Sequence, residues 1–515
     1  MIGMAAALSN AVAAEFVAQR GIAFPLIGMN LTWFAKLAVT TAFLGRLGEL
    51  QLAAGTLGYS FANVTGFAVL TGLCAAMEPI CGQAHGAGNA ALLRRALAMS
   101  TAMLCGASLA IALLWVRADD VLLRLGQQAD IAATGRAYVV GLLPDLAVAS
   151  FLNPLKAYLS AQEVTLPPLL AATLGLAAHI PLTACLSARM GIRGVAAAVW
   201  ISDLVVAAML AGYVLLSPGS AAAAAAPADD HHQQPAAAAA APADDHHQPA
   251  AAAAAAAPAP ADDHHQHQPA PPASLTWCCL LRLALPCCLN TCLEWWSYEI
   301  LVLLTGRLPD ARRAVAAVAV TLNFDYLLFA AMLSLSVSAS VRVSNELGAG
   351  DAALARRAAR VSLAGGALAG VAGGLLMLAA RRPWARLFSR SPEVREGVGR
   401  AMEVMALLEL VNFPLNVCGG IVRGTARPLL AVYAVVAGFY VLALPVGVFL
   451  AFRARLGLQG LLAGFIVGAA ASLAVLVAVI LRMDWDAEAQ RAHKRTAAGH
   501  EKQQEEDCNC NQPSS

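Results

Sequence analysis

The segment GAGNAALLRRA at residues 86–96 recurs as GAGDAALARRA at residues 348–358, 262 residues further along the chain. Chance matches in an alanine-rich chain would not hold one spacing from the first helix to the last, but further matches here do. The sequence therefore indicates two homologous halves. The other matches pair IAFP at 22–25 with LALP at 283–286, PLLA at 168–171 with PLLA at 428–431, and Gly191 and Gly194 with Gly457 and Gly460.

Both halves have the composition of helices in lipid. Of the 515 residues, 59% are hydrophobic and 13% are charged, whereas soluble domains carry roughly 25% charged residues. A helix that crosses a bilayer needs about 20 predominantly apolar residues, and the segments 96–116, 361–380 and 428–452 contain no charged side chain. The chain is therefore predicted to be an all-α integral membrane protein. Its net charge of +2 gives no electrostatic case for nucleic-acid binding.

Twelve segments are predicted to span the membrane, six in an amino-terminal lobe at 1–216 and six in a carboxyl-terminal lobe at 277–482. An even number per lobe gives both lobes the same orientation, so an axis along the membrane normal should relate them, with a cleft between them. Arg and Lys are nearly balanced between the two faces, so their distribution does not decide which face is cytosolic. The expected spans are 21–44, 52–76, 94–117, 133–157, 166–187, 192–216, 277–305, 314–338, 357–380, 401–420, 428–452 and 457–481.

The segment between the lobes, 217–276, differs from both. It repeats alanine runs followed by Asp-Asp-His-His, and it holds seven of the eleven histidines. Such clusters can bind a divalent metal weakly, but a disordered low-complexity linker is the favoured interpretation, and no metal site is predicted. Residues 483–515 read as a polar tail, in which Cys508 and Cys510 are either plain tail residues or sites of metal binding or acylation. The first span is expected to serve as the insertion signal, because no removable signal peptide precedes it.

Ionisable residues inside the spans are the candidates for function, because charges there are costly and are usually functional or paired. The carboxyl-terminal lobe is richer in such acids, so we expect proton handling there. A carboxyl group in a low-dielectric cavity can gain or lose a proton as the cavity faces either compartment. The candidates for proton coupling and the solute cavity are Glu294, Tyr298, Glu299, Asp325, Glu409 and Asn412, with Glu78, Asp145 and Asp203 as secondary candidates.

The seventh span presents two faces of interest. Glu294 and Tyr298 are four residues apart and share one face, whereas Trp295 and Glu299 share another about 100° away. Aromatic rings beside a carboxylate can hold a flat or cationic solute. The alternative is that the Trp side chains anchor the membrane interface and the acids pair with neighbouring helices.

Five longer motifs resemble plant members of the multidrug and toxic compound extrusion (MATE) family. They are FLGRLGE at 43–49, EPICGQA at 78–84, CLEWWSYE at 292–299, RVSNELGAG at 342–350 and RGTARP at 423–428. The resemblance covers nearly everything outside the linker and the tail.

The resemblance implies a twelve-helix fold of two six-helix bundles and antiport in which protons enter the cytosol as solute leaves. It also implies cytosolic termini and a proton gradient in place of a cofactor. By position, Glu294 matches the acid of the seventh helix thought to bind the coupling proton. Many relatives carry a second acid on the tenth helix where this chain has Asn412, and Glu409, one turn earlier, is a candidate substitute.

The alternative function is a uniporter, or a flippase for lipid-linked substrates, of the same build without proton coupling. An enzyme is not expected, because the chain has no His-Glu-x-x-His or Gly-x-Ser-x-Gly motif, and no phosphate-binding loop points to ATP. The expected partners are small organic solutes (xenobiotics, secondary metabolites or hormones), protons and the lipid bilayer, with a monomeric protein. The plasma membrane and the endomembranes (vacuole, Golgi, endosome) all remain open as its location.

Overall fold

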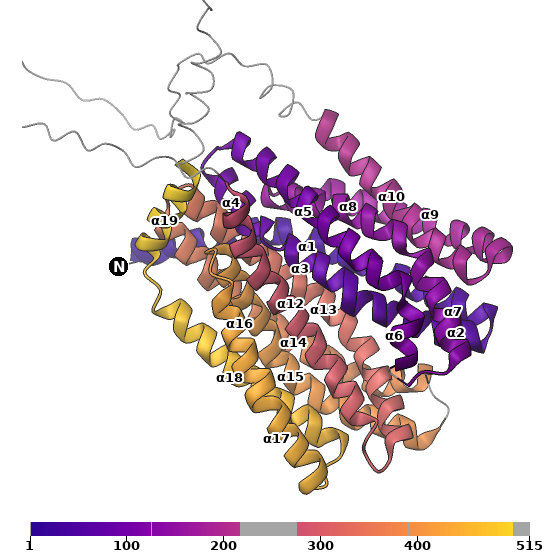
Figure 1. The fold of residues 1–515 in the computed structure, drawn as a ribbon. Coiled ribbons are helices and arrows are strands. Elements are labelled where there is room, and N and C mark those ends of the chain that lie inside the picture. Colours follow the sequence, from indigo (N-terminus) through magenta and orange to yellow (C-terminus); the bar gives the residue numbers. More distant parts are fainter. Residues whose placement is uncertain (1, 125, 217–274, 389–390, 498–515) are drawn as a thin grey trace, which may run out of the picture.

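The computed structural model describes residues 2–124, 126–216, 275–388 and 391–497, which are helical throughout apart from short connections. Figure 1 shows the amino-terminal helices, indigo to magenta, and the carboxyl-terminal helices, salmon to yellow, as two neighbouring bundles. The predicted disordered linker falls almost wholly outside the described residues, as do Cys508 and Cys510.

The amino-terminal bundle follows the predicted order of spans. Its second span is interrupted by a π-helical turn, and its fourth consists of two helices that meet at a bend of 41°. Its elements are α1 (Ile2–Leu47), α2 (Glu49–Ala62), η1 (Asn63–Phe67), α3 (Ala68–Cys74), α4 (Met77–Gly86), α5 (Ala90–Val116), α6 (Ala118–Arg124), α7 (Ala129–Gly141), α8 (Leu143–Ala161), α9 (Leu166–Met190) and α10 (Ile192–Leu216).

The carboxyl-terminal bundle repeats this plan with longer helices, and π-helical turns occur in its fifth span. Its elements are α12 (Trp277–Thr305), α13 (Ala311–Gly348), α14 (Ala352–Phe388), α15 (Pro392–Gly424), α16 (Leu429–Val435), η2 (Val436–Ala443), α17 (Leu444–Val448), η3 (Phe449–Arg453), α18 (Leu458–Leu481) and α19 (Trp485–Ala497).

Each predicted span falls within one of these helices or bent pairs. The described residues contain 11 helices long and apolar enough to cross a membrane, or up to 12 if the bent pair α7–α8 counts as one span. The predicted fold class is therefore confirmed. Helix α19 was not predicted, because it begins inside the segment that the sequence indicated to be a polar tail.

Matched positions of the two halves have the same local geometry. Gly88 and Gly350 both have positive φ, 70° and 81°, as do Gly191 and Gly457, at 59° and 57°. Positive φ favours glycine because it lacks a Cβ. The helix that follows the first pair begins in the same way in both halves: a side-chain oxygen of Asn89 or Asp351 accepts a hydrogen bond from the backbone N–H three residues later. These shared details support the duplication read from the sequence.

The first helix of each bundle packs against a helix of the other bundle. Helix α1 packs against α13 of the other bundle, and α12 packs against α3. The α3–α12 contact is close, because a Cβ added to Gly72 would lie 2.6 Å from the Cα of Cys288. Leu280 and Ala284 of α12 accordingly belong to the amino-terminal core. The interface between the lobes is thus built mainly from α1, α3 and α4 on one side and α12 and α13 on the other.

Candidate functional site

Four of the predicted site residues form one cluster inside the carboxyl-terminal bundle. Tyr298 comes from α12, Asp325 from α13, and Glu409 and Asn412 from α15. The Asn412 side-chain amide donates a hydrogen bond of 3.3 Å to the Tyr298 hydroxyl, and the Asp325 and Glu409 carboxyl groups lie close enough to interact electrostatically. Glu409 is 0% exposed and Asp325 is 4% exposed. The structure therefore brings these four candidate side chains together.

The Asp325–Glu409 contact has a chemical consequence. Two carboxylates that are buried beside each other repel strongly when both are ionised. No N–H or hydroxyl donor among the described residues reaches Asp325 Oδ1 or either carboxyl oxygen of Glu409. Neither acid forms an ion pair with a described lysine or arginine. The pair thus has no fixed counter-ion among the described residues.

Glu294 lies beside this cluster rather than within the pair. It interacts electrostatically with Tyr298 on one side and with Arg423 of α15 on the other. Arg423 also donates a hydrogen bond from Nε to Glu78 of α4, at 3.1 Å. Arg423 is therefore ion-paired with Glu78 and also interacts electrostatically with Glu294 at the end of the cluster.

Glu299 is not brought to the acid pair. Glu299 interacts electrostatically with Tyr326 of α13. The Tyr326 ring stacks on Phe34 of α1, with ring centroids 5.9 Å apart. On the neighbouring face of α12, Trp295 meets Phe329 edge to face at 5.6 Å. These rings extend from the carboxyl-terminal bundle towards α1 of the other bundle.

The amino-terminal bundle holds a second polar cluster that includes two of the secondary candidates. Lys36 Nζ of α1 donates to Asp203 Oδ2 of α10 at 2.5 Å, and Asp145 of α8 interacts with both. The Thr40 hydroxyl and His179 Nε2 lie 3.1 Å apart within the same region. Unlike the acid pair, this cluster includes a lysine, Lys36, that forms an ion pair with one of its acids.

Glu78, the remaining secondary candidate, belongs to a seal between the lobes. Its ion pair with Arg423 crosses from α4 to α15, and Gln83 Nε2 donates to the Gly424 carbonyl oxygen at 3.1 Å. Close packing supports these bonds, because a Cβ on Gly86 would collide with the backbone of Asn345, and one on Gly348 with the backbone of Gln83. Residues 83 and 86 correspond to 345 and 348 in the repeat, so the seal is itself two-fold symmetric.

A second ion network lies at the same end of the molecule. Arg342 of α13 donates to Glu15 of α1, to Glu163 after α8 and to Glu346 on its own helix, at 2.5 to 3.0 Å. Together with Glu78–Arg423, these are the ion pairs between the lobes within the described part of the chain. All of them lie near the end of the bundle where α1 begins and α19 ends (Figure 1), which we call the termini face. The ion pairs that join the two lobes are therefore concentrated at that face.

Sequence reasoning missed Glu15, Arg342 and Arg423. Glu15 lies before the first predicted span, which began at residue 21, whereas α1 already begins at Ile2. Both arginines belong to motifs quoted for the resemblance, so the motifs themselves were the available signal. Their carboxylate partners are 327 and 345 residues away in the chain, and no local pattern reveals such pairs.

Comparisons with known proteins agree with this architecture. The sequence pattern of the family described as MatE matches residues 25–185 and 286–449, one stretch in each lobe. Protein DETOXIFICATION 56 of Arabidopsis thaliana is 44% identical over 497 residues, which cover 96% of this chain and 93% of that protein. Protein DETOXIFICATION 51 of the same plant is 34% identical over 479 residues, covering 93% and 82%.

Solved structures show the same likeness. The crystal structure of the eukaryotic MATE transporter AtDTX14 matches with a TM-score of 0.80 at 26% identity, over 94% of this chain and 100% of that one. A Vibrio cholerae MATE transporter shares the fold, with a TM-score of 0.74 at 18% identity over 93% and 99% of the two chains. The chain therefore belongs to the MatE family, the multidrug and toxic compound extrusion transporters, and is a multi-pass membrane transporter and not an enzyme.

Proposed function

We propose that this transporter is a proton-coupled antiporter that exports small organic molecules from the cytosol by alternating access. The observation that carries the proposal is the Asp325–Glu409 pair, two buried carboxyl groups that interact with each other and have no basic partner among the described residues. Two carboxylates this close cannot both be ionised without strong repulsion. The pair therefore binds a proton when exposed to the acidic side and releases it when an arriving cation replaces that charge.

The locked termini face supports the alternating part of the proposal. With cytosolic termini, as the family resemblance implies, the Glu78–Arg423 and Glu15–Arg342 pairs close the cytosolic side, so the structure corresponds to an outward-facing state. Transport then requires these pairs to break while α1, α3, α12 and α13 pivot on one another.

The surroundings of the acid cluster favour an amphipathic cation as solute. Glu294 adds a further acid at the end of the cluster, beside an arginine that is already ion-paired with Glu78. The rings of Trp295 and Tyr326 provide flat apolar surfaces near it. Cation–π contact and stacking on such rings, beside an acid, favour planar organic cations over neutral or anionic molecules.

The test is uptake in sealed proteoliposomes with an imposed pH gradient, using ethidium as the cationic probe. Glu409→Gln keeps the shape of the side chain but removes its proton chemistry, so accumulation driven by the gradient should fall to the level of empty vesicles. Glu403→Gln is the matched control on the same helix, because Glu403 is half exposed and pairs with Arg381 at 3.5 Å. That variant should transport like the unmodified protein.

Glu294→Gln separates the two assigned roles. It should raise the ethidium concentration needed for half-maximal uptake while leaving the dependence on the pH gradient intact. Gradient-driven accumulation by Glu409→Gln at normal abundance would overturn the proposal. Equal fluxes with and without the gradient in the unmodified protein would favour the uniporter instead.

A further inference from the structure

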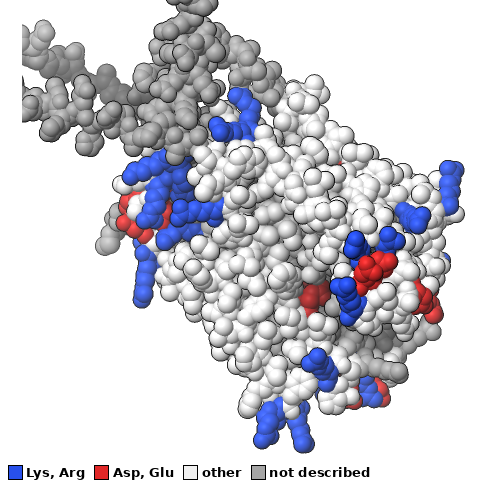
Figure 2. Space-filling view, in the orientation of Figure 1, with Lys and Arg blue, Asp and Glu red and all other residues white. Residues whose placement is uncertain are grey.

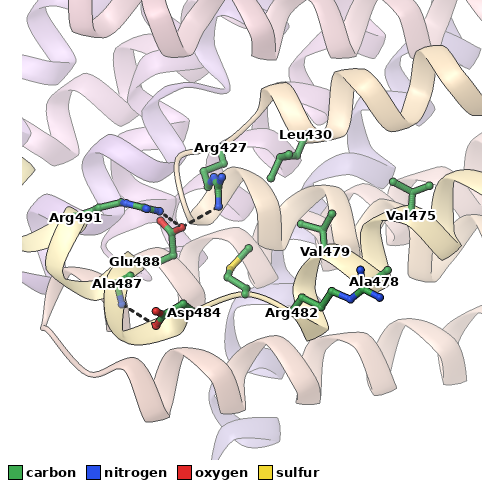
Figure 3. A pocket seen from close by; sticks show the side chains of 11 residues that line it. Arg427, Leu430, Val475, Ala478, Val479, Arg482, Asp484, Ala487, Glu488 and Arg491 are labelled. Atoms are coloured by element: carbon green, nitrogen blue, oxygen red, sulfur yellow. Dashed lines mark hydrogen bonds and ion pairs between the residues drawn. The ribbon is translucent and has the colours of Figure 1, made fainter.

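An open pocket of about 590 Å³ lies at the termini face, where α18 ends and α19 begins, away from the acid cluster (Figure 3). Two kinds of side chain line it. Leu430 of α16 and Val475 and Val479 of α18 form an apolar wall, and three arginines also line the pocket. They are Arg427, Arg482 and Arg491. Two of these arginines converge on Glu488, whereas the third, Arg482, extends along the end of α18 beside Ala478 (Figure 3). Nothing in the proposed transport cycle uses this pocket.

The apolar wall is continuous with the lipid-facing surface. Helix α18 is a membrane span that ends at Leu481, so Arg482 is the first residue beyond it. Val475 is 48% exposed and Leu481 is 68% exposed, which is expected of spanning-helix side chains that face acyl chains. A lipid tail can therefore enter the pocket sideways from the bilayer, whereas its headgroup meets the arginines at the membrane boundary.

Two of the three arginines bind the same carboxylate. Arg427 and Arg491 both donate to Glu488 Oε1, at 3.1 and 2.5 Å, as the dashed lines in Figure 3 show. Glu488 is 2% exposed, yet the two arginine side chains are 46% and 57% exposed, so guanidinium N–H groups remain free for another acceptor. Arg482 forms no ion pair within the described residues.

The charges of the pocket leave a surplus of one positive charge. Three arginines face two acids, Glu488 and Asp484, and the Asp484 carboxylate accepts a hydrogen bond from the backbone N–H of Ala487 at the start of α19. More basic side chains gather around the pocket, as Figure 2 shows at the end of the molecule where α19 lies. Arginine matches phosphate oxygens in geometry as well as charge.

We propose that this pocket binds an anionic glycerophospholipid with a singly charged phosphodiester headgroup. The phosphate is held by Arg427 and Arg491, and Arg482 adds its positive charge from the end of α18. The first part of one acyl chain lies along Val475 and Val479. Basic pockets at the ends of spanning helices bind anionic headgroups through this combination of charge and apolar surface. The lipid fastens α19 to the end of α18, and α19 in turn packs on both lobes.

The experiment measures retention of dioleoyl phosphatidylinositol. Protein is purified from nanodiscs of phosphatidylcholine with a minor share of phosphatidylinositol, and the bound lipid is counted by native mass spectrometry. Arg482→Gln should lower retention about fivefold, the factor expected for one arginine at a membrane surface. The control is Arg453→Gln, which removes the same charge from an exposed arginine at the opposite end of the carboxyl-terminal bundle, where η3 ends.

A second arm separates a lipid from a soluble anion. Inorganic phosphate, added to protein in pure phosphatidylcholine nanodiscs, should not change the thermal unfolding temperature, whereas phosphatidylinositol should raise it for the unmodified protein and not for Arg482→Gln. Equal retention by the unmodified protein and Arg482→Gln, or an equal loss in Arg453→Gln, would overturn the proposal. An equal rise of the unfolding temperature with inorganic phosphate would show that the pocket is a site for a soluble anion. That result would overturn the lipid proposal.

Discussion

The two lobes bury polar clusters of different charge character. The amino-terminal cluster contains a lysine paired with an aspartate, Lys36 and Asp203. The carboxyl-terminal cluster contains two acids, Asp325 and Glu409, that interact with each other. The amino-terminal acids, Asp203 and the neighbouring Asp145, have Lys36 beside them. The carboxyl-terminal acid pair has no cation among the described residues and can be neutralised only by a proton or a cationic solute.

The repeat shows that this difference arose after the duplication. With the spacing of the nearest matched motifs, Lys36 corresponds to Ser297, and Asp203 corresponds to Ala469. In the other direction, Asp325 corresponds to Asn63, and Glu409 falls on the alanine-rich part of α8. Each cluster therefore belongs to one lobe alone. The shared backbone plan supplies two equivalent bundles, and a few side chains assign them different tasks.

The largest expected effect concerns stability in the amino-terminal lobe. Lys36→Ala leaves the Asp203 carboxylate without its partner at a mostly buried position, which should cost about 3 kcal/mol. The measurement is thermal unfolding in detergent. Adding Asp203→Ala should recover much of the loss, because the unpaired charge is then gone. By comparison, Glu409→Gln should leave the unfolding temperature nearly unchanged.

That contrast is open to direct contradiction. If Glu409→Gln unfolds as early as Lys36→Ala, the acid pair is a structural element and not a proton store. If the double variant is no more stable than Lys36→Ala, the unpaired charge is not the cause of the loss.

An intermediate effect is expected at the seal of the termini face. Arg423→Gln removes the ion pair with Glu78, a hydrogen bond to a charged group at a mostly buried position, and should weaken closure by about 2 kcal/mol. Cysteines placed in α4 and α15 on the termini face should then react faster with a membrane-impermeant thiol reagent. Arg381→Gln is a fair control, since Arg381 pairs with Glu403 inside one lobe. Unchanged reactivity in Arg423→Gln would remove this pair from the gate.

The smallest effect compares two matched helix starts. Asn89 and Asp351 occupy the same position of the repeat and cap the following helix alike, but only Asn89 also donates to α19, through the Thr496 carbonyl oxygen at 3.0 Å. Substitution by alanine should cost about 1 kcal/mol at Asp351 for the lost cap. At Asn89 it should cost roughly 1 kcal/mol more for the lost hydrogen bond. Equal losses of unfolding temperature would show that α19 contributes nothing through this contact.

Hydropathy and the repeat were sufficient to predict the fold, because a membrane span needs a long apolar segment that one window of sequence reveals. Helix α19 escaped this reasoning: it has 13 residues, is rich in charge and is held by tertiary contacts. The site was predicted in part. Asp325 and Glu409 were identified as acids inside spans, Tyr298 by its helical spacing from Glu294, and Asn412 by the resemblance. The sequence could not show that Asp325 would lie beside Glu409, or Glu294 near Arg423. Those partners come from different helices, and packing alone decides them.

The central claim is that one lobe exchanges a proton for solute and the other does not. The most direct measurement is proton release when ethidium binds to purified protein in weakly buffered detergent solution. The unmodified protein and Asp203→Asn should both release protons on binding, and Glu409→Gln and Asp325→Asn should release none. Undiminished release from Glu409→Gln, or its loss in Asp203→Asn alone, would contradict the account.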